Sequence, residues 1–503
     1  MRVLVLGAGL AGLAATEELL DRGASVTVVE AFPLPGGRTA SFDVPVPVAG
    51  LLPGDVVEHG LHAWFQHYHA LYGLMERAGV RKPPFAGEGI HFFDANAGHY
   101  EVLGGPLFWL LNSLALPESL RGPKGALLSA FGRLVGSLGS RLARAEETDR
   151  DSALFLLRSV GVPEPAIEHV FRPCLFSLTS LRLEALSALE FLRWMSGIIP
   201  DPRIRCFLAG ATPAMDAPIA AHLAARGADF RFGVEATRLS LRRDGSVAVE
   251  MRRAPDRTGV RHVLVQGFVP AEPPDPGEFD AVVSTLPWER LLELSHGDPG
   301  LSELPAFRAM RGLDNVHPLT VRLWFERPIP SAAERYVLAS GTVFDVLRPT
   351  PEPGRGNDGV RLVDALAEDV TALGIPYRGE RFVPEGPERD AIVERFVSDL
   401  ERMYPGEIRS NRVLRAFVHT REGIVACRPG AWSHRAPQWI DLPRFVLAGD
   451  WTRHPYGVCM EGAVRSGALA AEALDRGRAV EASPWAFAQV LYSTRSVFQR
   501  TRG

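Results

Sequence analysis

Three short clusters in this sequence have the residue types and the spacing to bind a dinucleotide. They are Gly7-Ala8-Gly9-Leu10-Ala11-Gly12, Glu30 followed by Gly36-Gly37-Arg38, and Gly449-Asp450. In the first cluster, Gly7 permits a tight turn, Gly9 leaves space for a pyrophosphate, and Gly12 lets a helix pack closely on a strand. Glu30 can accept hydrogen bonds from both hydroxyls of a ribose and would repel a 2′-phosphate, so the pattern disfavours NADP.

The elements around the first cluster are those that such a site requires. Residues 2–6 read as a buried strand, a helix is predicted from Leu13 to about Arg22, and a second strand runs from Ser25 to Val29 and ends in Glu30. A phosphate group would then lie on the free N–H groups and the positive end of the helix. The alternative is a glycine-rich strand–helix–strand unit without a nucleotide, which the acid at the end of the second strand disfavours.

The other two clusters favour FAD over NAD. In Gly36-Gly37-Arg38 the glycines let the backbone pass under the pyrophosphate, and the arginine adds a positive charge to it. Near the end of the chain, a strand from Phe445 is expected to end in Gly449-Asp450, where Asp450 can accept a hydrogen bond from the ribityl chain. A helix is predicted to open at Met460-Glu461-Gly462-Ala463, and its N-terminus can face the flavin O2. It would stabilise negative charge there by ~0.3–1 kcal/mol when exposed.

Composition limits the class of protein. With 503 residues, of which 46% are hydrophobic and 23% charged, the chain can form a large core and two or three domains. The formal net charge of −4 disfavours a nucleic-acid partner. The 4 cysteines are scattered without a CxxC pair, which predicts a reducing compartment and neither a disulfide framework nor a zinc site. No metal is expected at His59, His62, His67 and His69, because no carboxylates or cysteines cluster with them.

The segment from Leu103 to Ala145 allows two interpretations. Its leucines and phenylalanines recur at helical spacing with basic residues between them. The pattern fits either a pair of core helices or an interfacial helix that dips into a bilayer. No apolar run reaches about 18 residues without charges, so no spanning helix is expected. We expect a cytoplasmic protein that is peripheral or monotopic on the inner face of the membrane.

A second GxGxxG pattern, at residues 354–359, is interpreted as a surface turn. No strand is expected to lead into it, prolines precede it, and a strand rather than a helix should follow. Without an NAD(P)H site, electrons are expected to leave the flavin for an outside acceptor.

Together these motifs resemble the FAD-dependent amine-oxidase superfamily and, within it, the plant and cyanobacterial type of phytoene and zeta-carotene desaturases. The resemblance covers nearly the whole chain up to Val480. The matching residues are Gly60-Leu61-His62-Ala63-Trp64-Phe65 with Tyr68, Ala426-Cys427-Arg428-Pro429, Leu447-Ala448-Gly449-Asp450-Trp451-Thr452 and Met460-Glu461-Gly462-Ala463. The chain departs from the family pattern at Trp451, Arg453-His454 and Cys459, where tyrosine, Lys-Gln and serine are usual.

The resemblance implies FAD held without a covalent bond and a long apolar tunnel entered from the membrane. It implies dehydrogenation of an apolar lipid, a carotenoid or another isoprenoid, with a quinone or oxygen as acceptor. A proton would leave one carbon and a hydride would pass from its neighbour to flavin N5. Val234 would hold the adenine through its backbone, and Gly60, Leu61 and His62 would border the cofactor. His62 and Arg428 are the candidates for catalytic residues on the flavin face, and a structural role stays open for each.

Other functions stay open. Bacterial hydroxysqualene dehydroxylases share several of these motifs, so the substrate could be hydroxysqualene or a fatty-acyl lipid. An amine oxidase is disfavoured because many such enzymes place a lysine beside flavin N5, whereas no lysine follows Lys124. A non-enzymatic flavin-binding protein would show no flavin reduction with any lipid.

The predicted architecture is α/β. An FAD-binding, Rossmann-type (glutathione-reductase-like) domain is assembled from residues 1–85, 205–290 and 415–476. An α+β substrate domain that faces the membrane is inserted as residues 86–204 and 291–414. Residues 477–503 are expected to form a C-terminal helical tail.

Overall fold

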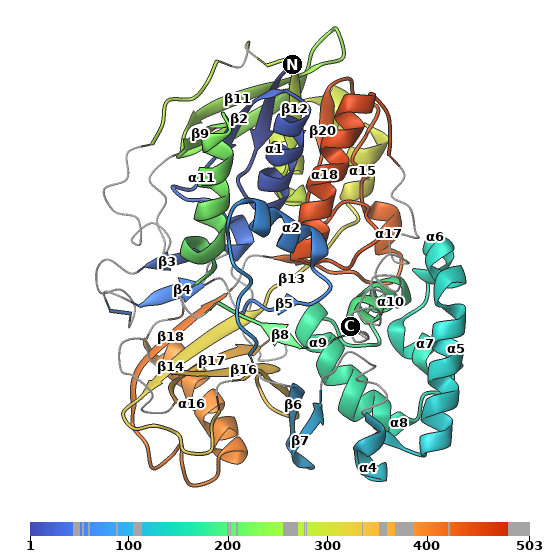
Figure 1. The fold of residues 1–503 in the computed structure, drawn as a ribbon, viewed down its shortest axis with the longest axis vertical. Coiled ribbons are helices and arrows are strands. Elements are labelled where there is room, and N and C mark those ends of the chain that lie inside the picture. The colour runs from blue at the N-terminus through green and yellow to red at the C-terminus, as the bar shows by residue number, and fades with distance from the viewer. Residues whose placement is uncertain are drawn as a thin grey trace, which may run out of the picture.

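The computed structural model describes residues 1–43, 51–52, 55–58, 61–86, 89–103, 113–198, 201, 203–207, 210–254, 270–275, 277, 279–333, 335–351, 360–367, 384, 386–420 and 423–480. Gly60, the second GxGxxG pattern at 354–359 and the predicted tail beyond residue 480 lie outside the described residues. Figure 1 shows a first sheet between helices at the top, a second sheet at the lower left and a helical region at the lower right.

The first sheet is parallel and is covered on both faces. Its strands, in spatial order, are β20 Phe445–Leu447, β12 Ala281–Ser284, β1 Arg2–Leu6, β2 Ser25–Glu30 and β9 Asp229–Phe232. Val3 and Val5 pack with helices α1 Leu10–Asp21 and α18 Met460–Arg476, whereas Leu4 and Leu6 join the core on the other face. Burial on both faces explains why these strands are almost continuously apolar, and it confirms the predicted α/β class.

A two-stranded ribbon and three helices cover the second face of that sheet. They are β10 Val234–Leu241, β11 Val247–Arg253, α13 Trp288–Ser295, α14 Pro299–Ser302 and α15 Pro305–Met310. On the first face, α1 and α18 touch backbone to backbone. A Cβ atom on Gly467 of α18 would lie 2.2 Å from the carbonyl oxygen of Ala11, so only glycine permits this approach.

The second sheet is mixed and has seven strands. In spatial order they are β18 Val413–Thr420, β14 Leu319–Phe325, β17 Val360–Ala367, β16 Val346–Pro351, β15 Val337–Ser340, β6 Gly89–Asp94 and β7 Gly98–Leu103. Helix α16, Gly386–Met403, covers one face, and its Phe396 is buried in the same core as Val321 and Leu323 of β14. The other face turns toward the first half of the chain, where the Tyr336 hydroxyl donates to the carbonyl of His62 at 2.6 Å.

The helical region lies beside this second sheet (Figure 1). Its helices are α4 Glu118–Arg121, α5 Lys124–Ala143, α6 Ala145–Thr148, α7 Ala153–Ser159, α8 Glu164–Ala166, α9 Arg172–Thr179 and α10 Ala188–Ile198. Helix α5 buries Leu127, Ala130 and Leu134 in the core, while Leu128 and Val135 are 44% and 45% exposed. Among the described residues, no helix combines the length and the apolar character needed to cross a membrane.

Shorter elements connect these regions. They are η1 Gly37–Thr39, β3 Ser41–Asp43, β4 Val56–Glu58, β5 Trp64–Phe65, α2 His69–Arg77, η2 Ser113–Ala115, η3 Ile167–Phe171, β8 Ile204–Arg205, η4 Thr212–Asp216, α11 Ala217–Ala225, β13 Asn315–Val316, β19 Ile424–Val425 and α17 Ala431–His434.

Several predicted elements can be compared with this fold. Strands β1 and β2 have the predicted bounds, whereas α1 begins at Leu10 and not at Leu13, because Gly9 takes the N-cap position directly after the turn. The expectation that no strand leads into the second GxGxxG pattern was wrong, since β16 ends at Pro351; strand β17 follows, as predicted. The parallel sheet takes strands from all three segments assigned to the FAD domain, and the domain boundaries stay predictions.

Candidate cofactor and active site

The first two glycine clusters form a backbone cradle at the carboxyl end of β1. Gly7 has a φ of +105°, and its N–H donates to the carbonyl of Val29 at 2.8 Å, which ties the turn to β2. Gly36 has a φ of +117°, donates to the carbonyl of Ala8 at 2.9 Å and forms a β-bridge with Gly9. The structure therefore brings the two predicted clusters side by side.

Two glycines of this cradle differ in what a side chain would meet. At Gly12 a Cβ atom would lie 2.0 Å from the Gly7 carbonyl oxygen, so no side chain fits unless the turn moves. At Gly9 the nearest atoms would be 3.8 Å and 3.9 Å away, which is ordinary contact. The protein's own packing thus requires Gly12, whereas the space at Gly9 is open.

The start of α1 fits an anion at that open space. Its N-cap, Gly9, provides no side-chain cap, and the first turn, which includes Leu10, Ala11 and Gly12, has no acidic residue. Such a helix N-terminus presents N–H groups and a partial positive charge, which are the features that hold a pyrophosphate.

Glu30 fixes the same turn from the end of β2. Its Oε2 accepts from the Ala8 N–H at 2.9 Å, and its Oε1 accepts from the Phe32 N–H at 2.8 Å. A carboxylate has about four acceptor positions, so these contacts are compatible with hydrogen bonds to a ribose. Val234 begins β10 beside this strand end, since the neighbouring Gly233 N–H donates to the carbonyl of Phe32 at 3.3 Å.

Arg38 and Asp450 meet although almost the whole chain separates them in sequence. Arg38 Nη2 forms an ion pair with Asp450 Oδ1. His62 joins them from a third segment: its Nε2 lies 3.0 Å from the carbonyl oxygen of Arg38, and its Nδ1 lies 3.7 Å from Glu58 Oε1. Three predicted site residues are therefore neighbours.

The N-terminus of α18 lies next to this group in sequence. The helix begins at Met460, and its N-cap Cys459 makes no side-chain capping bond. The carboxylate of Glu461 accepts from the N–H groups of Ala70 and Leu71 at 3.0 Å each, which caps the start of α2. A contribution of Glu461 to the cofactor site would thus come from its backbone N–H. The N–H of Ala463 donates to the carbonyl of Cys459 at 2.9 Å.

Asp216 is a buried residue of the site that sequence reasoning missed. It lies under the second glycine cluster, where a Cβ atom on Gly36 would be 2.4 Å from its Oδ2. The hydroxyl of Thr39 donates to its two carboxylate oxygens at 3.0 Å and 3.2 Å. Burial raises the pKa of Asp216 to about 6, although the bonds from Thr39 and Thr212 and the charge of His62 act to lower it. No local motif pointed to Asp216, because its contacts are formed only in the folded chain.

We expect Asp216 to make stability depend on pH. Folding raises its pKa from 3.8 to about 6, so its stabilising contribution is complete below the lower value and is lost as the pH rises through the higher one. Asp216→Asn mimics the protonated group. Between about pH 4.5 and pH 7.5 the wild type should therefore lose on the order of 2 kcal/mol relative to the variant. Urea unfolding of both proteins across this range is the measurement, and parallel pH curves would contradict the expectation.

A second missed residue, Arg435, holds the segment between β20 and α18. It is 2% exposed and donates from Nη2 to the carbonyls of Asp450 and Thr452 at 2.7 Å each, and from Nε to the carbonyl of Trp451 at 3.1 Å. Glu190 of α10 lies 3.7 Å from its Nη1 and accepts from the Val458 N–H at 2.6 Å. Arg435 therefore fixes the backbone that carries Asp450.

The positions at which the sequence departs from the family pattern have roles in this network. Trp451 is buried and donates from Nε1 to the carbonyl of Leu286 at 3.1 Å. His454 is hydrogen-bonded to Arg435 at 3.1 Å. Burial and the charge of Arg435 hold the pKa of His454 well below its usual range, so its ring is neutral at physiological pH.

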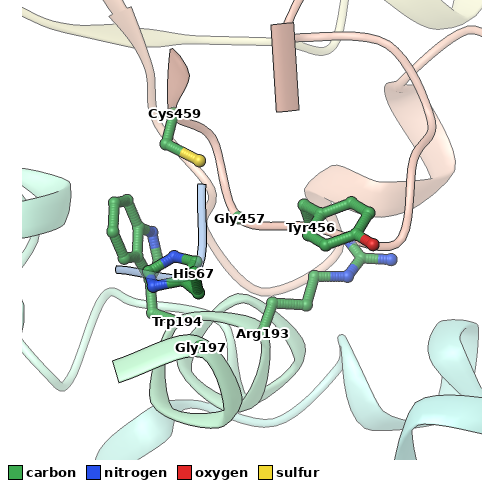
Figure 2. Close-up of a pocket in the computed structure, with 7 residues that line it drawn as sticks. All are labelled: His67, Arg193, Trp194, Gly197, Tyr456, Gly457 and Cys459. Atoms are coloured by element: carbon green, nitrogen blue, oxygen red, sulfur yellow. The ribbon is translucent and has the colours of Figure 1, made fainter. Parts of the chain in front are cut away.

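Cys459, the third departure, lines a small cavity beside the start of α18 (Figure 2). The cavity has a volume of about 10 Å³, which is the size of one water molecule. Its lining consists of His67, Arg193, Trp194, Gly197, Tyr456, Gly457 and Cys459. Figure 2 shows the rings of His67 and Trp194 together below Cys459, and Arg193 extending toward Tyr456.

Cys427 and Cys459, which lie in or next to the sequence motifs of the predicted flavin site, are poor nucleophiles. Burial raises the pKa of Cys459 to about 12 and that of Cys427 well above its usual value, so both remain thiols at neutral pH. Burial also lowers the pKa of His67 to about 3, so this ring is neutral at neutral pH. These states agree with a flavin held without a covalent bond.

Arg428 stands apart from the other predicted site residues. Its side chain is 46% exposed, and its Nε lies 3.4 Å from Asp314 Oδ2 on the surface. These surroundings give no support to a catalytic role.

Leu61 is half-buried and packs against the main core. Among the described residues, no group of three or more His, Cys, Asp or Glu side chains could hold a metal ion.

The match to a known family decides what this cradle binds. The flavin containing amine oxidoreductase family matches residues 10–475 of the chain. The chain belongs to this family. It is therefore an FAD-dependent oxidoreductase, and the open space at Gly9, the uncapped start of α1 and the position of Glu30 all fit FAD.

The curated relatives of this chain include carotene desaturases. A 15-cis-phytoene desaturase of Synechococcus elongatus is 26% identical over 501 residues, which cover 94% of this chain and 96% of the relative. A zeta-carotene desaturase of Synechocystis is 24% identical over 514 residues, with 94% and 97% covered.

Solved structures confirm the fold of this flavoprotein. Cyclohexylamine oxidase from Brevibacterium oxydans has a TM-score of 0.64 at 15% identity and covers 95% of this chain and 99% of its own. Putrescine oxidase bound to putrescine has a TM-score of 0.62 at 15% identity, with the same coverage. At this identity the likeness concerns the fold alone.

Proposed function

We propose that this flavoprotein dehydrogenates a long apolar isoprenoid and passes the electrons to a quinone or to oxygen. The substrate that we favour is a carotene intermediate. The observation that carries the proposal is the likeness to phytoene and zeta-carotene desaturases along 94% of the chain. A carotene has no polar handle, so its binding would rest on burial of apolar surface at ~25 cal/mol per Å². An outside acceptor is proposed because only the first GxGxxG pattern has the strand–helix context of a dinucleotide site.

The chain's own residues would hold and orient the cofactor. We assign the pyrophosphate to the backbone at Gly9, Gly36 and Gly37 with the start of α1, the ribose to Glu30, and the flavin end to Asp450 with the start of α18. When bound, FAD supplies the hydride acceptor for the dehydrogenation. His62 is our candidate for the residue that borders the reacting end, because its ring is fixed between the Arg38 carbonyl and Glu58.

An amine substrate is the second candidate, and the likeness in fold to two amine oxidases is what favours it. The sequence has no lysine after Lys124, so it lacks the residue that many amine oxidases place beside flavin N5. An ammonium group in an apolar channel would also be left unpaired, which costs several kcal/mol. We therefore expect no peroxide when polyamines or aromatic amines are added, and peroxide release would favour this second candidate.

An anaerobic assay tests the dehydrogenation. The FAD-loaded protein is mixed with liposomes that carry phytoene, zeta-carotene, hydroxysqualene or an unsaturated fatty-acyl lipid, and the flavin absorption band is followed. We expect a carotene to bleach the band and to yield a product two hydrogens lighter. Bleaching by the acyl lipid alone would remove the isoprenoid substrate from the proposal. No bleaching by any lipid would favour a non-enzymatic flavin protein.

We also propose that the protein binds the inner face of the cytoplasmic membrane through α5. Its exposed Leu128 and Val135 lie on the same helix as Lys124 and Arg141. Such a helix can bury its apolar side chains at the headgroup level while its basic residues face anionic lipids. The solvent-exposed positions of Leu128 and Val135 support this interpretation, and the burial of Leu127, Ala130 and Leu134 shows that the same helix is also a core helix.

Flotation with anionic liposomes is expected to recover the wild type in the lipid fraction. The double variant Leu128→Asp, Val135→Asp should reduce the bound fraction at least about tenfold, because two side chains worth roughly 1.5 kcal/mol each no longer leave water. Leu414→Asp, at a leucine that is 45% exposed on β18, serves as the matched control and should float like the wild type. Equal flotation of all three proteins would argue against a membrane contact through α5.

A further inference from the structure

The small cavity beside the start of α18 is lined by polar groups that have no partner in the described protein. His67, Arg193 and Trp194 contribute to its lining, together with Cys459 at the N-cap of α18. The Nε of Arg193, the Nε1 of Trp194 and the Nδ1 of His67 are buried and have no hydrogen-bond partner among the described residues. Each of these three side chains is at most 9% exposed. Leaving such atoms unsatisfied is unfavourable, so the cavity calls for an occupant.

These unpartnered groups favour an occupant that accepts hydrogen bonds. The N–H groups of a guanidinium and of an indole can only donate, whereas His67 Nδ1 donates or accepts according to its tautomer. In Figure 2 the rings of His67 and Trp194 lie together on the left of the cavity and Arg193 lies on the right. Donors on two sides suit an atom on which negative charge forms.

Arg193 also places a positive charge at this cavity. Burial and the charge of Arg435 lower the pKa of Arg193 to about 10, so its guanidinium group stays charged at neutral pH. Its Nη1 lies 4.0 Å from Glu190 Oε2, which is nearer to Arg435 at 3.7 Å. The guanidinium carbon lies 4.0 Å from the centre of the Trp432 ring. The Nε of Arg193 takes part in neither ion pair and remains for the cavity.

The place and the size of the cavity limit what could react there. Cys459, which lines the cavity, is the N-cap of the helix whose start we assign to the flavin end. A volume of about 10 Å³ holds one water or a diatomic molecule, but neither a quinone ring nor a lipid chain. Cys459 is half-buried, whereas the other lining residues are buried, so a small molecule would pass a single side chain to enter.

We propose that this cavity is the site at which dioxygen accepts the electrons of the dehydrogenation. The inference rests on the proposed function and deepens it, because it selects dioxygen from the two acceptors named there. Dioxygen takes up two electrons and two protons and becomes hydrogen peroxide. The electrons and one proton correspond to the hydride taken from the lipid, and the second proton is the one lost by the neighbouring carbon. The charge of Arg193 and the N–H of Trp194 would stabilise the negative charge that dioxygen gains on the way.

The reduction of dioxygen can be measured without any lipid. The flavin of the FAD-loaded protein is reduced by light under argon and mixed with air-saturated buffer, and the return of the flavin band gives a second-order rate constant. Arg193→Met removes the charge and the Nε donor, so the rate constant should fall at least roughly tenfold. With a water-soluble benzoquinone in place of dioxygen, the wild type and Arg193→Met should reoxidise at equal rates, because the quinone ring does not fit the cavity.

Three further variants separate the charge, the donor and the fold. Arg193→Lys retains the positive charge and should keep the rate constant for dioxygen within about threefold of the wild type. Trp194→Phe retains a ring but not the N–H, and it should lower the rate constant by a smaller factor than Arg193→Met. Arg121→Met is the matched control, because Arg121 of α4 is 6% exposed and donates to the carbonyl of Leu116 at 2.8 Å, away from the cavity lining. Its rate constant should equal that of the wild type.

The presence of dioxygen in the cavity has a readout that needs no electron transfer. Dioxygen is paramagnetic and speeds the relaxation of nuclei that it approaches. In the oxidised, FAD-loaded protein labelled with fluorotryptophan, a higher dioxygen pressure should speed the relaxation of the fluorine signal of Trp194 several times more than that of Trp324. The two side chains are equally deep, at 4% and 3% exposure, so depth alone predicts equal effects. Trp194→Phe and Trp324→Phe assign the two signals.

Equal relaxation effects at the two tryptophans would overturn the inference and would leave the cavity to a structural water. Reoxidation that Arg193→Met slows equally for dioxygen and benzoquinone would overturn it as well. The anaerobic lipid assay gives an independent result. Bleaching by a carotene, with reoxidation by dioxygen that does not depend on Arg193, would keep the dehydrogenation and overturn the dioxygen site. Reoxidation that depends on Arg193, without bleaching by any lipid, would support the site and remove the lipid substrate.

Discussion

A Gly9→Val variant is expected to fold and to purify without flavin. The backbone at Gly9 has φ −73° and ψ 176°, which valine adopts readily, and a Cβ atom there meets only ordinary contacts. The added methyl groups would fill the space that we assign to the pyrophosphate. FAD affinity should fall at least about a hundredfold, since the loss of two charge-assisted hydrogen bonds at about 1.5 kcal/mol each already amounts to this factor. Flavin absorbance of the purified protein and titration of the apoprotein with FAD measure the effect.

Gly12→Ala is the control that separates ligand binding from folding. Its methyl group would lie 2.0 Å from the Gly7 carbonyl oxygen, so this smaller substitution should destabilise the fold and lower the yield of soluble protein. Gly9→Val should instead keep the far-ultraviolet circular dichroism spectrum of the wild-type apoprotein. Full flavin occupancy in Gly9→Val would overturn the assignment of the pyrophosphate to this cradle.

Arg435→Met is expected to give the largest loss of stability among single substitutions at the site. Methionine retains much of the volume but removes the donors to three consecutive carbonyls and leaves Glu190 without its closest cation. Breaking such a buried ion pair from one side typically costs about 3–5 kcal/mol. Because the same carbonyls belong to the segment with Asp450, FAD should also dissociate at a lower urea concentration. Urea unfolding followed by tryptophan and flavin fluorescence reports both effects.

Arg428→Met, a short distance upstream, is the matched control. Arg428 is exposed and pairs with Asp314, which is more exposed still, so its loss should change stability by no more than about 0.5 kcal/mol. The same variant tests the catalytic role predicted for Arg428 from the family pattern. The lipid that reduces the wild-type flavin fastest serves as the substrate. An unchanged rate of flavin reduction would exclude the catalytic role, whereas a much lower rate at unchanged stability would restore it. Arg435→Lys shows whether a positive charge alone is enough to keep the stability of the wild type, because lysine lacks the planar guanidinium group of arginine.

Local signals in the sequence predicted local structure well. The glycine spacing and the acid at residue 30 identified the cradle, and the strands predicted at residues 2–6 and from Ser25 to Glu30 have the bounds that the structure shows. The ion pair between Arg38 and Asp450 could not be predicted in this way, because it joins residues 412 positions apart. The same holds for Asp216 and Arg435, whose partners lie on other elements and leave no periodic trace in the sequence.

The polar face of the second sheet shows a different limit of sequence patterns. Leu319-Thr320-Val321-Arg322 alternates between apolar and polar residues, which is typical of a strand with one face in water. In the fold this polar face is buried, with Thr320 at 5% exposure, because the cofactor-binding half covers it. A pattern of polar residues shows that they need polar partners but does not distinguish water from an ion pair or a ligand.

The order of strands in the parallel sheet has a consequence for biosynthesis. β1 and β2 are made first, but β12 and β20 complete their sheet, and α18 packs on α1. The cradle therefore remains incomplete until residues 445–476 have left the ribosome, and one face of the apolar strand β1 is fully covered only when α18 has been synthesised. FAD would load after translation and would stabilise only the finished fold. We expect the flavin supply of the host cell at that moment to control how much of the newly made chain escapes aggregation and proteolysis.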